Sequence, residues 1–543
     1  MKKILLSLIF TAVFCCYSQS AFDDGSSEFT GFGGDLIDSS EGMPIEFQGT
    51  EGTSAPSPDN GQTAEEIINV GEVQDQIEVV EPVENLPDIS EKLPELLNNI
   101  FDGRNVKTEE LLGGDDPEIQ GYISNLQQSP FNGDIISFEV SVPGDESVRL
   151  FLYNMESEFL FQISPVEDYE QNIKMIPFPV KDRGVSWHPS KNALVFYSNG
   201  YENREQIFIA KITDPYFIEE VPVIIQRIEF EEPKRTVNHC LYADFNSTGE
   251  DLYFTVRIEK ENIKEKYNRY LNIAVAEDIF KYEPDGFSDV KYKVLFNRKF
   301  DQIKPVSSPS DPDVIAFLSF SDEFKENYGY AKYSLVVYNL KTGKSSLIDK
   351  LTGYRDYPYQ WGPSGKRLYY CAALPIQKTP NAFREKRMNI INLQVAEMKF
   401  GNDGSIRSRI VENSSSPYIM GDVATKDQGI SFVSDDLLLM AKYDPYESIF
   451  LVDMEKWSKN DGFYIKQLPI SDDTDFPVLG KKSFIFLKYQ YFNMPDNTIK
   501  TVSTVNAIPY EPEVDEEALR RKKERRAKKK AERSIERSIE SGE

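Results

Sequence analysis

The chain has 543 residues, which is long enough for several average domains or for one large repeat assembly with tails. It contains 61 Lys and Arg residues against 89 Asp and Glu residues, so its formal net charge is −28. This acidic balance argues against a nucleic-acid-binding protein, which normally has a basic excess, and the chain lacks the several long apolar runs of a multi-span membrane protein. Two histidines are too few for a histidine-built metal centre. Aromatic residues make up 12% of the chain, a composition that suits β-structure.

The first twenty residues have the pattern of a secretory signal peptide. Residues 1–3 are Met-Lys-Lys, residues 4–16 are apolar but too few to span a bilayer, and Ser18 and Ser20 are the small residues that a signal peptidase reads. We therefore predict a signal peptide at 1–20, cleavage near Ser20 and Ala21, and a periplasmic or otherwise exported mature protein. An N-terminal membrane anchor is the alternative.

Only two cysteines, Cys240 and Cys371, follow the predicted leader. An exported protein can hold a disulfide, and spacing alone does not decide whether these two residues meet. Both lie in strand-like stretches, and free cysteines commonly behave as small core residues. We expect two separate buried thiols rather than a disulfide.

Residues 21–87 are predicted to form a disordered acidic arm. Residues 21–110 contain 22 acidic and three basic residues, a local net charge of −19, and the first part is rich in Gly, Ser and Pro. A segment of low hydrophobicity and high net charge does not bury enough apolar surface to offset its chain entropy.

A short helix and linker are predicted at 88–118. Ser90 can cap a helix that places Leu93, Leu96, Leu97 and Ile100 on one face, and Gly103 is a stop signal. The helix either docks on the folded part of the chain or binds a partner.

From 119 to 508 the chain repeats a turn followed by an apolar strand. Each unit begins with Ser, Pro, Asn, Asp or Gly, and the strands end at residues 138, 196, 254, 317, 370, 440 and 486. A second strand follows each of them. Repeats of about 46 to 70 residues built from about four strands are typical of β-propeller blades, in which radial closure protects the strand edges. We predict an all-β fold, a β-propeller with seven blades, and keep six or eight blades and one or two β-sandwiches as alternatives.

The fifth unit, Trp361-Gly362-Pro363-Ser364-Gly365-Lys366-Arg367-Leu368-Tyr369-Tyr370, resembles the repeat of TolB-like propellers, which are related to WD-repeat propellers. The second unit, at 187–196, is similar, with His188 and Ser190 at two of the repeat positions. This resemblance covers 119–508 and implies a TolB-like propeller fold. In such a repeat, Pro and Gly shape the turn between two strands, and aromatic residues pack between blades.

Catalytic and cofactor motifs are scarce in the sequence. It contains no Gly-x-Ser-x-Gly nucleophile elbow and no phosphate-binding glycine loop. A general base or triad at His188 or His239 is a minor alternative, and Asp472, Asp473 and Asp475 are interpreted as a solvated acidic turn rather than a calcium loop. We predict that the chain is not an enzyme and uses no cofactor or metal.

Four long connections between paired strands, at 255–268, 319–332, 372–387 and 487–497, are basic and aromatic. If each joins the second and third strands of its blade, all four lie on one face of the propeller. Loops on a rigid scaffold are common binding sites, so we predict a partner surface for an acidic segment there, with ordinary solvated loops as the alternative. The candidate partner-binding residues are Lys260, Lys264, Lys266, Tyr267, Phe324, Tyr328, Phe383, Arg384, Lys386, Arg387 and Tyr491.

The C-terminal segment 509–543 is predicted to be a charged, basic helical tail. Residues 520–533 contain ten basic and two acidic residues, and Leu519, Ala527, Ala531, Ile535 and Ile539 form a thin apolar stripe at multiples of four. A solvated helix, association with the acidic arm and docking to an anionic membrane surface are the three interpretations. The residues predicted for membrane contact are Arg520, Arg521, Lys522, Lys523, Arg525, Arg526, Lys528, Lys529 and Lys530.

Together these features predict an exported, non-catalytic protein-binding scaffold in the bacterial cell envelope that binds envelope proteins and no nucleic acid. The alternative is an enzyme or carbohydrate-binding protein that uses the central cavity. Carboxylates and aromatic rings around the central tunnel would favour the alternative, and an apolar, filled tunnel would favour the scaffold.

Overall fold

The computed structural model describes the chain between residues 93 and 510, apart from single residues, short stretches and longer gaps at 101–107, 114–118, 167–171, 261–269, 297–300, 322–331, 350–358, 375–389, 412–429 and 460–463. The predicted signal peptide and acidic arm lie outside the described residues, as does the predicted C-terminal tail from residue 511 onward; Pro509, its first predicted residue, belongs to a strand. Among the residues described, no helix combines the length and apolarity needed to cross a membrane.

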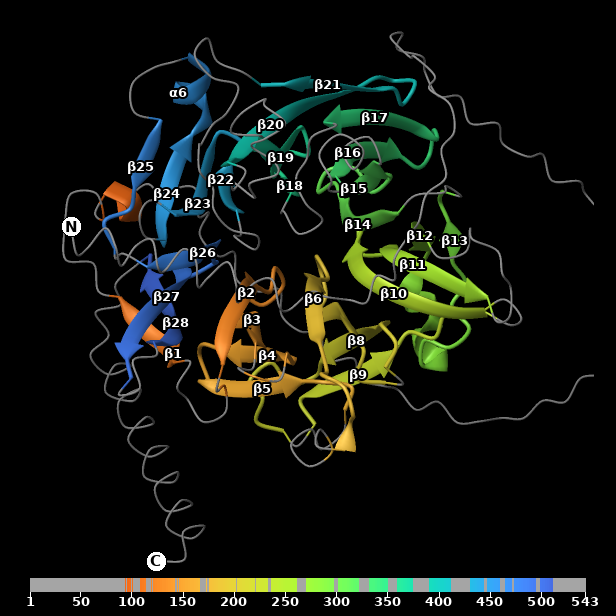
Figure 1. Cartoon of the computed structure of the whole chain (residues 1–543), viewed down its shortest axis with the longest axis horizontal. Helices are drawn as coiled ribbons and strands as arrows, with labels where there is room; N and C mark the ends of the chain where they lie inside the picture. Colours follow the sequence, from red (N-terminus) through yellow and green to blue (C-terminus); the bar gives the residue numbers. More distant parts are fainter. Residues whose placement is uncertain are drawn as a thin grey trace, which may run out of the picture. The chain divides into compact units, whose positions relative to one another are not determined.

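The described strands form seven antiparallel sheets of four strands each, arranged around a central axis (Figure 1). This is a seven-bladed β-propeller, as the sequence predicted. We number the blades 1 to 7 in chain order of their innermost strands. The bounds are β2 (Tyr122–Gln128), β3 (Ile135–Ser141), β4 (Val148–Asn154) and β5 (Phe159–Ile163) in blade 1; β6 (Asp182–Trp187), β7 (Ala193–Ser198), β8 (Gln206–Ile212) and β9 (Val223–Arg227) in blade 2; β10 (Thr236–Phe245), β11 (Leu252–Lys260), β12 (Leu271–Ala276) and β13 (Lys293–Val294) in blade 3; β14 (Gln302–Ser307), β15 (Val314–Ser321), β16 (Lys332–Asn339) and β17 (Lys344–Asp349) in blade 4; β18 (Tyr359–Trp361), β19 (Arg367–Leu374), β20 (Ile390–Phe400) and β21 (Ile406–Ile410) in blade 5; β22 (Ile430–Ser434), β23 (Leu437–Tyr443), β24 (Glu447–Asp453) and β25 (Ile465–Gln467) in blade 6; and β26 (Thr474–Leu479), β27 (Ser483–Asn493), β28 (Ile499–Pro509) and β1 (Glu109–Gly113) in blade 7. A 3₁₀ helix, η3 (Ile279–Asp285), and a short helix, α6 (Met454–Lys459), lie in connections of blades 3 and 6.

Blade 7 is completed by the first strand of the chain. β1 pairs antiparallel with β28. The first three strands of blade 7 are therefore β26, β27 and β28, and its outermost strand is β1. The repeat resemblance began only at residue 119 and did not include β1, which lies in the stretch expected to be helix and linker. Hydrogen bonds between the first and the last described strands of the propeller therefore close the ring.

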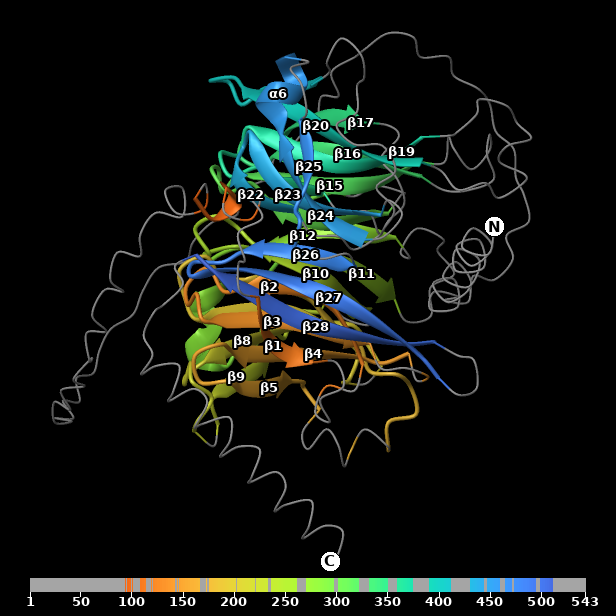
Figure 2. The same cartoon turned by 90° about the vertical axis from the view of Figure 1, so that its left-hand side faces the viewer.

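The propeller has two faces, which we name by the connections they contain. The connections between second and third strands lie on the upper face, and those between first and second strands lie on the lower face, because the four strands of a blade alternate in direction. In Figure 2 the hairpin of β27 and β28 points to the right, toward the upper face, and the orange helical segment near residues 93–100 lies on the left, at the lower face.

The turns of the repeat motif fold as local hydrogen-bonded units on the lower face. In blade 5 the Gly362 N–H donates to the Arg367 carbonyl at 2.8 Å, and the Gly365 N–H donates to the Gly362 carbonyl at 2.9 Å. Gly365 has a φ of +67°, a conformation that glycine adopts without strain. The motif tryptophan then fixes the blade to its neighbour, since the Trp361 Nε1–H donates to the Val306 carbonyl of blade 4 at 3.1 Å.

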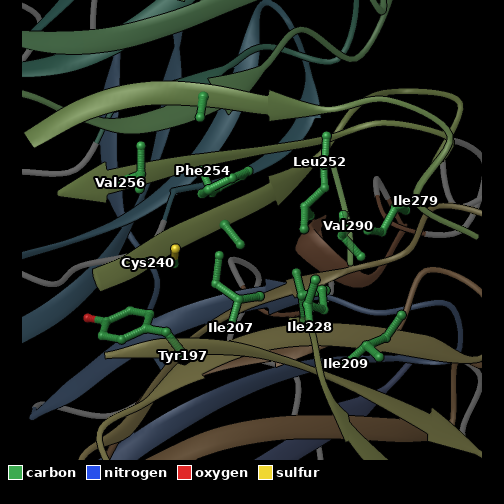
Figure 3. Packing of buried hydrophobic residues seen from close by; sticks show 14 of the residues in the cluster. Tyr197, Ile207, Ile209, Ile228, Cys240, Leu252, Phe254, Val256, Ile279 and Val290 are labelled. Atoms are coloured by element: carbon green, nitrogen blue, oxygen red, sulfur yellow. The ribbon is translucent and has the colours of Figure 1, made fainter. Parts of the chain in front are cut away.

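Apolar side chains fill the space between neighbouring blades. Figure 3 shows the cluster between blades 2 and 3, where Ile207 and Ile209 of β8 lie near Cys240, Phe254 and Val256 of blade 3. These strands are apolar on both faces because each sheet is covered on both sides by another blade. Blade-to-blade packing thus explains the near-continuous apolar runs seen in the sequence.

The helical segment at 93–100 packs against the chain's own propeller. The side chains of Leu93, Leu96, Leu97 and Ile100 are buried in a cluster with Leu439, Ile449, Leu468, Phe484, Phe486, Ile508 and Tyr510 of blades 6 and 7. The structure therefore agrees with the interpretation of a helix docked on the folded domain, rather than one offered to a partner.

The two cysteines after the leader do not form a disulfide. Cys240 on β10 and Cys371 on β19 are both buried free thiols, and burial raises the pKa of Cys371 to about 12. This confirms the expectation of two separate core thiols.

His188 is a packing residue in the turn of blade 2. Its ring is buried and makes edge contacts with Phe245 at 5.0 Å and Phe280 at 5.1 Å. Its Nδ1 accepts a hydrogen bond from the Ser190 N–H at 3.0 Å, and burial lowers its pKa to about 4. The neutral imidazole therefore packs between blades 2 and 3.

Gly249 gives a test of this contact. It has a φ of +78°, and a Cβ there would overlap the His188 ring. We expect Gly249→Ala to lower the free energy of unfolding by about 2 kcal/mol, since both backbone strain and a clash result. Gly144→Ala is the matched control, because Gly144 also has a positive φ, +89°, but a Cβ there meets nothing within 4 Å. Chemical denaturation measures the free energy of unfolding of both variants. Equal losses in the two variants would contradict the packing role of His188.

Candidate binding face

The four connections proposed as a partner surface do join second and third strands. They follow β11, β15, β19 and β27, which are the second strands of blades 3, 4, 5 and 7. The premise that placed them on one face is therefore met. The strands extend further than the sequence suggested, since β11 continues to Lys260 and β27 to Asn493, so residues such as Arg257 belong to a strand instead of a loop.

Two of the eleven predicted partner-binding residues lie in the described part of the chain. Tyr491 is on β27 with 42% of its surface exposed, and Lys260 is the last residue of β11. The other nine lie outside the described residues: Lys264, Lys266, Tyr267, Phe324, Tyr328, Phe383, Arg384, Lys386 and Arg387. The nine membrane-contact candidates of the tail, at 520–530, also lie outside them.

Most of the innermost strands have a bulge in their middle. In five of the seven blades the bulge contains a residue with positive φ, and these residues are Asn125, Gly184, Tyr242, Lys304 and Phe476. A bulge of this kind bends a strand and redirects its side chains. Two of the bulged amides are held by the preceding blade: the Gly184 N–H donates to Glu139 Oε1 at 2.8 Å, and the Lys304 N–H donates to Thr255 Oγ1 at 3.1 Å.

Cationic and tyrosine side chains gather around these bulges in blades 2 to 4. We call Arg183, Tyr197, His239, Tyr242, Arg257 and Lys304 the upper polar cluster. Arg183 lies opposite Tyr197 across β6 and β7, and His239 lies opposite Arg257 across β10 and β11. Directly opposite residues of an antiparallel pair place their side chains on the same face of the sheet.

Aromatic and cation–π contacts link the cluster across three blades. The rings of Tyr197 and Tyr242 pack edge to face with 5.4 Å between centroids, and Lys304 Nζ lies 5.2 Å from the centre of the Tyr242 ring. A cation at this distance from a tyrosine ring is attracted by the electrostatic field of the ring. Tyr197, Tyr242 and Lys304 therefore connect blades 2, 3 and 4.

A carboxylate lies at the edge of the cluster. His239 Nδ1 is 2.6 Å from Glu205 Oε2. The hydrogen bond from His239 lowers the pKa of Glu205, and the positive charge of Arg257 acts in the same direction. Glu205 is thus ionised at neutral pH and holds the imidazole in place.

Two further aspartates on the innermost strands are buried. Asp244 accepts hydrogen bonds from Ser186 Oγ and from the Ser307 N–H, each at 2.7 Å, and so connects blades 2, 3 and 4. Burial raises its pKa to about 6. Asp182 is completely buried, and burial raises its pKa to about 7, although hydrogen bonds from the Ser198 and Ser164 hydroxyls act in the opposite direction.

Asp475, the last aspartate of the acidic run, is not in a solvated turn. Asp475 is a buried residue of the innermost strand β26, and its carboxylate accepts a hydrogen bond from the Phe476 N–H at 2.7 Å. The sequence interpretation was wrong for Asp475, because the strand begins inside the acidic run and the ring buries it. Among the described residues, no group of three or more His, Cys, Asp or Glu side chains is arranged to hold a metal ion.

Comparisons with known proteins give the fold alone. No protein-family model matches the chain, and no curated protein matches it. Solved structures that match include an oligogalacturonate lyase in complex with manganese, with 11% identity and a TM-score of 0.45 over 75% of this chain and 94% of that one. TolB from Acinetobacter baumannii matches with 12% identity and a TM-score of 0.34 over 65% of each chain. A prolyl endopeptidase matches with 11% identity and a TM-score of 0.35 over 74% of this chain and 47% of that one. The likeness is one of fold.

These structures correct one prediction. The sequence analysis concluded that the chain is not an enzyme, whereas the structures that share its propeller include a lyase and peptidases. The propeller fold is compatible with catalysis as well as binding, and the scarcity of histidine was not a sufficient reason to exclude it.

Sequence reasoning missed the strand residues of the upper polar cluster. Arg183 and Lys304 could not be identified as candidates, because each lies in a short innermost strand that is not part of the repeat motif. A usable signal was present in blade 2, where a glycine inside a strand pattern, Gly184, indicates a bulge.

Proposed function

We propose that the chain is an exported binding protein that receives an acidic segment of a protein partner on the upper face of its propeller. The observation that most directly supports this is the upper polar cluster, in which Arg183 lies opposite Tyr197, Lys304 lies beside the Tyr242 ring and Arg257 lies opposite His239. It lies on the face where the four long connections begin and end. Arginine and tyrosine are enriched at the centres of protein interfaces.

The basic residues of the long connections extend this proposal. Lys264, Lys266, Arg384 and Lys386 belong to the connections of blades 3 and 5, which leave the same face. Opposite charges across an interface speed association and select partners. The partner is therefore expected to be acidic, and the cell envelope is its expected location because the first twenty residues resemble a signal peptide.

Charge reversal in the cluster tests the proposal. We expect Arg257→Glu combined with Lys304→Glu to weaken binding of a fluorescein-labelled glutamate-rich peptide at least tenfold in an anisotropy titration, since two attractive charges become repulsive. The matched control is Arg409→Glu with Lys466→Glu, which reverses two charges on the outermost strands β21 and β25. Equal losses in both variants would show a response to net charge alone and would contradict a site on the upper face.

A carbohydrate ligand at the central channel is the second candidate. The tunnel was expected to favour this alternative if carboxylates and aromatic rings surrounded it, and the half-buried Tyr242 of the innermost strand β10 is the ring that supports it. The same variants separate the two functions, because a neutral oligosaccharide stacked on tyrosine would keep its affinity after charge reversal. Calorimetry with neutral and acidic oligosaccharides measures the difference.

A further inference from the structure

The lower face of blades 1 and 2 exposes a group of large apolar side chains. Phe159 on β5 is 42% exposed, and Tyr216, Ile218 and Val221, in the connection between β8 and β9, are 45%, 70% and 62% exposed. We call these four residues the lower apolar patch. Contiguous exposed apolar surface on a soluble protein commonly marks a contact site.

The connection that presents the patch is held rigidly. The carboxylate of Asp214 accepts hydrogen bonds from the N–H groups of Tyr216, Ile218 and Glu219 at 2.6 to 2.9 Å. Asn154 Nδ2 donates to the Pro215 carbonyl at 2.6 Å, and Ser157 Oγ donates to the Tyr216 carbonyl at 2.9 Å. Beneath the connection, Phe217 is buried and stacks on Phe161 with 5.9 Å between ring centroids.

The exposure of Ile218 and Val221 is therefore a fixed property of the surface. Phe217 supplies the burial that holds this connection on blade 1, whereas 70% of Ile218 and 62% of Val221 stay exposed. Their side chains are available to a ligand without any rearrangement of the loop.

The described chain ends close to this patch. The Tyr510 N–H donates to the Lys482 carbonyl at 3.1 Å, and Lys482 Nζ donates to Asp134 of blade 1 at 2.7 Å. Glu156 and Tyr216 lie near enough to Lys482 to interact with its charge. The described chain therefore ends on the lower face, at the backbone of the residue whose side chain reaches blade 1 and interacts with Tyr216.

The sequence after Tyr510 complements the patch in charge and polarity. Residues 520–533 contain ten basic and two acidic residues, and Leu519, Ile535 and Ile539 are the large apolar members of the stripe. Around the patch, Glu156 and Glu219 are exposed, and Glu158 is half-buried. Attachment at Tyr510 also raises the local concentration of the segment to the millimolar range, on the order expected for a short tether.

We propose that the C-terminal segment 511–543 docks on the lower apolar patch of its own propeller, with Ile535 or Ile539 on Ile218 and Val221 and basic residues beside Glu156 and Glu219. The docked segment covers the lower face and leaves the upper face open. This docking is independent of the function proposed for the upper face.

Limited trypsin digestion of the full chain tests the docking, because the segment is rich in Lys and Arg. We expect Ile218→Asp with Val221→Asp to speed tryptic loss of the residues after 519 at least fivefold, measured by intact-protein mass spectrometry. The matched control is Leu347→Asp with Phe400→Asp, which changes two exposed apolar residues of blades 4 and 5 that are 46% and 37% exposed. Unchanged digestion in the patch variant, or an equal change in the control, would overturn the proposal.

An engineered cysteine pair shows which segment binds the lower apolar patch. Cys240 and Cys371 are buried, so Ile218→Cys with Ile535→Cys introduces the reactive thiols, and an intramolecular disulfide formed at low protein concentration supports the docking. Disulfide-linked dimers in its place would assign the patch to a second copy. Protection of the segment from trypsin only in the presence of anionic phospholipid vesicles, and to the same extent in the Ile218→Asp variant, would assign the segment to a membrane surface. Disulfide-linked dimers or vesicle-dependent protection would each overturn intramolecular docking.

Discussion

Deletion of residues 1–113 is expected to open the ring and remove most of the stability of the propeller. It takes away β1, which pairs with β28, and the helical segment whose four leucine and isoleucine side chains are buried against blades 6 and 7. Burial of one such side chain stabilises a fold by about 1.5 to 3 kcal/mol, so the four contribute about 8 kcal/mol before the strand pairing is counted. That loss is comparable to the whole stability of a typical domain, about 5 to 15 kcal/mol.

The matched control is a deletion of residues 1–86, which lie before every residue the structure describes. Thermal unfolding followed by circular dichroism should give the same midpoint for this control and for the full chain. The longer deletion should unfold at a far lower temperature or aggregate through the exposed edge of β28. A deletion of 1–113 that melted like the control would show that β1 and the helix are dispensable.

Asp182→Asn is expected to stabilise the protein above pH 7 and to have little effect below pH 4. Burial raises the pKa of Asp182 from 3.8 to about 7, so the folded state favours the protonated carboxyl. The stability that this proton provides is complete below pH 3.8 and is lost as pH rises through about 7. Since one pKa unit corresponds to about 1.4 kcal/mol, the ionised carboxylate costs about 4 kcal/mol at pH 8, and a neutral amide avoids that cost.

Urea denaturation at pH 4 and pH 8 measures this difference. Asp285→Asn, the same change at an exposed position in blade 3, is the matched control and should show no comparable gain between pH 4 and pH 8. If the gain of Asp182→Asn did not grow between pH 4 and pH 8, the buried carboxyl would already be ionised with a partner, contrary to its position in the structure.

The seven second strands could be predicted from the sequence because each follows its own turn signal. In blade 5 the Trp-Gly-Pro-Ser-Gly sequence defines the turn by local hydrogen bonds, so β19 begins where the pattern indicates. β1 could not be predicted in this way. Its sequence, Glu-Glu-Leu-Leu-Gly, is acidic and has no β-branched or aromatic residue, and it is a strand because β28 pairs with it from the other end of the chain.

The candidate site was predicted only in its location. The pattern of long connections predicted that they share one face, and the strand order agrees, because topology alone decides on which side second and third strands are joined. The partner surface on that face stays a prediction. The identity of the cluster residues depends on three blades meeting at their innermost strands. Tyr197, Tyr242 and Lys304 are far apart in sequence, and no local pattern shows that the ring brings them together.

The strand that closes the ring has a consequence for the order of events during synthesis. β1 leaves the ribosome before every other strand of the propeller, whereas its partner β28 is the last strand to be made. Throughout that interval β1 has no strand to pair with, and contacts between residues so distant in sequence form slowly. A chain that is halted or cut before β28 has six complete blades at most and two unpaired sheet edges, which are open to aggregation or to exchange of strands with another copy. Synthesis of β28, rather than the folding of any single blade, therefore sets the moment at which the propeller can close.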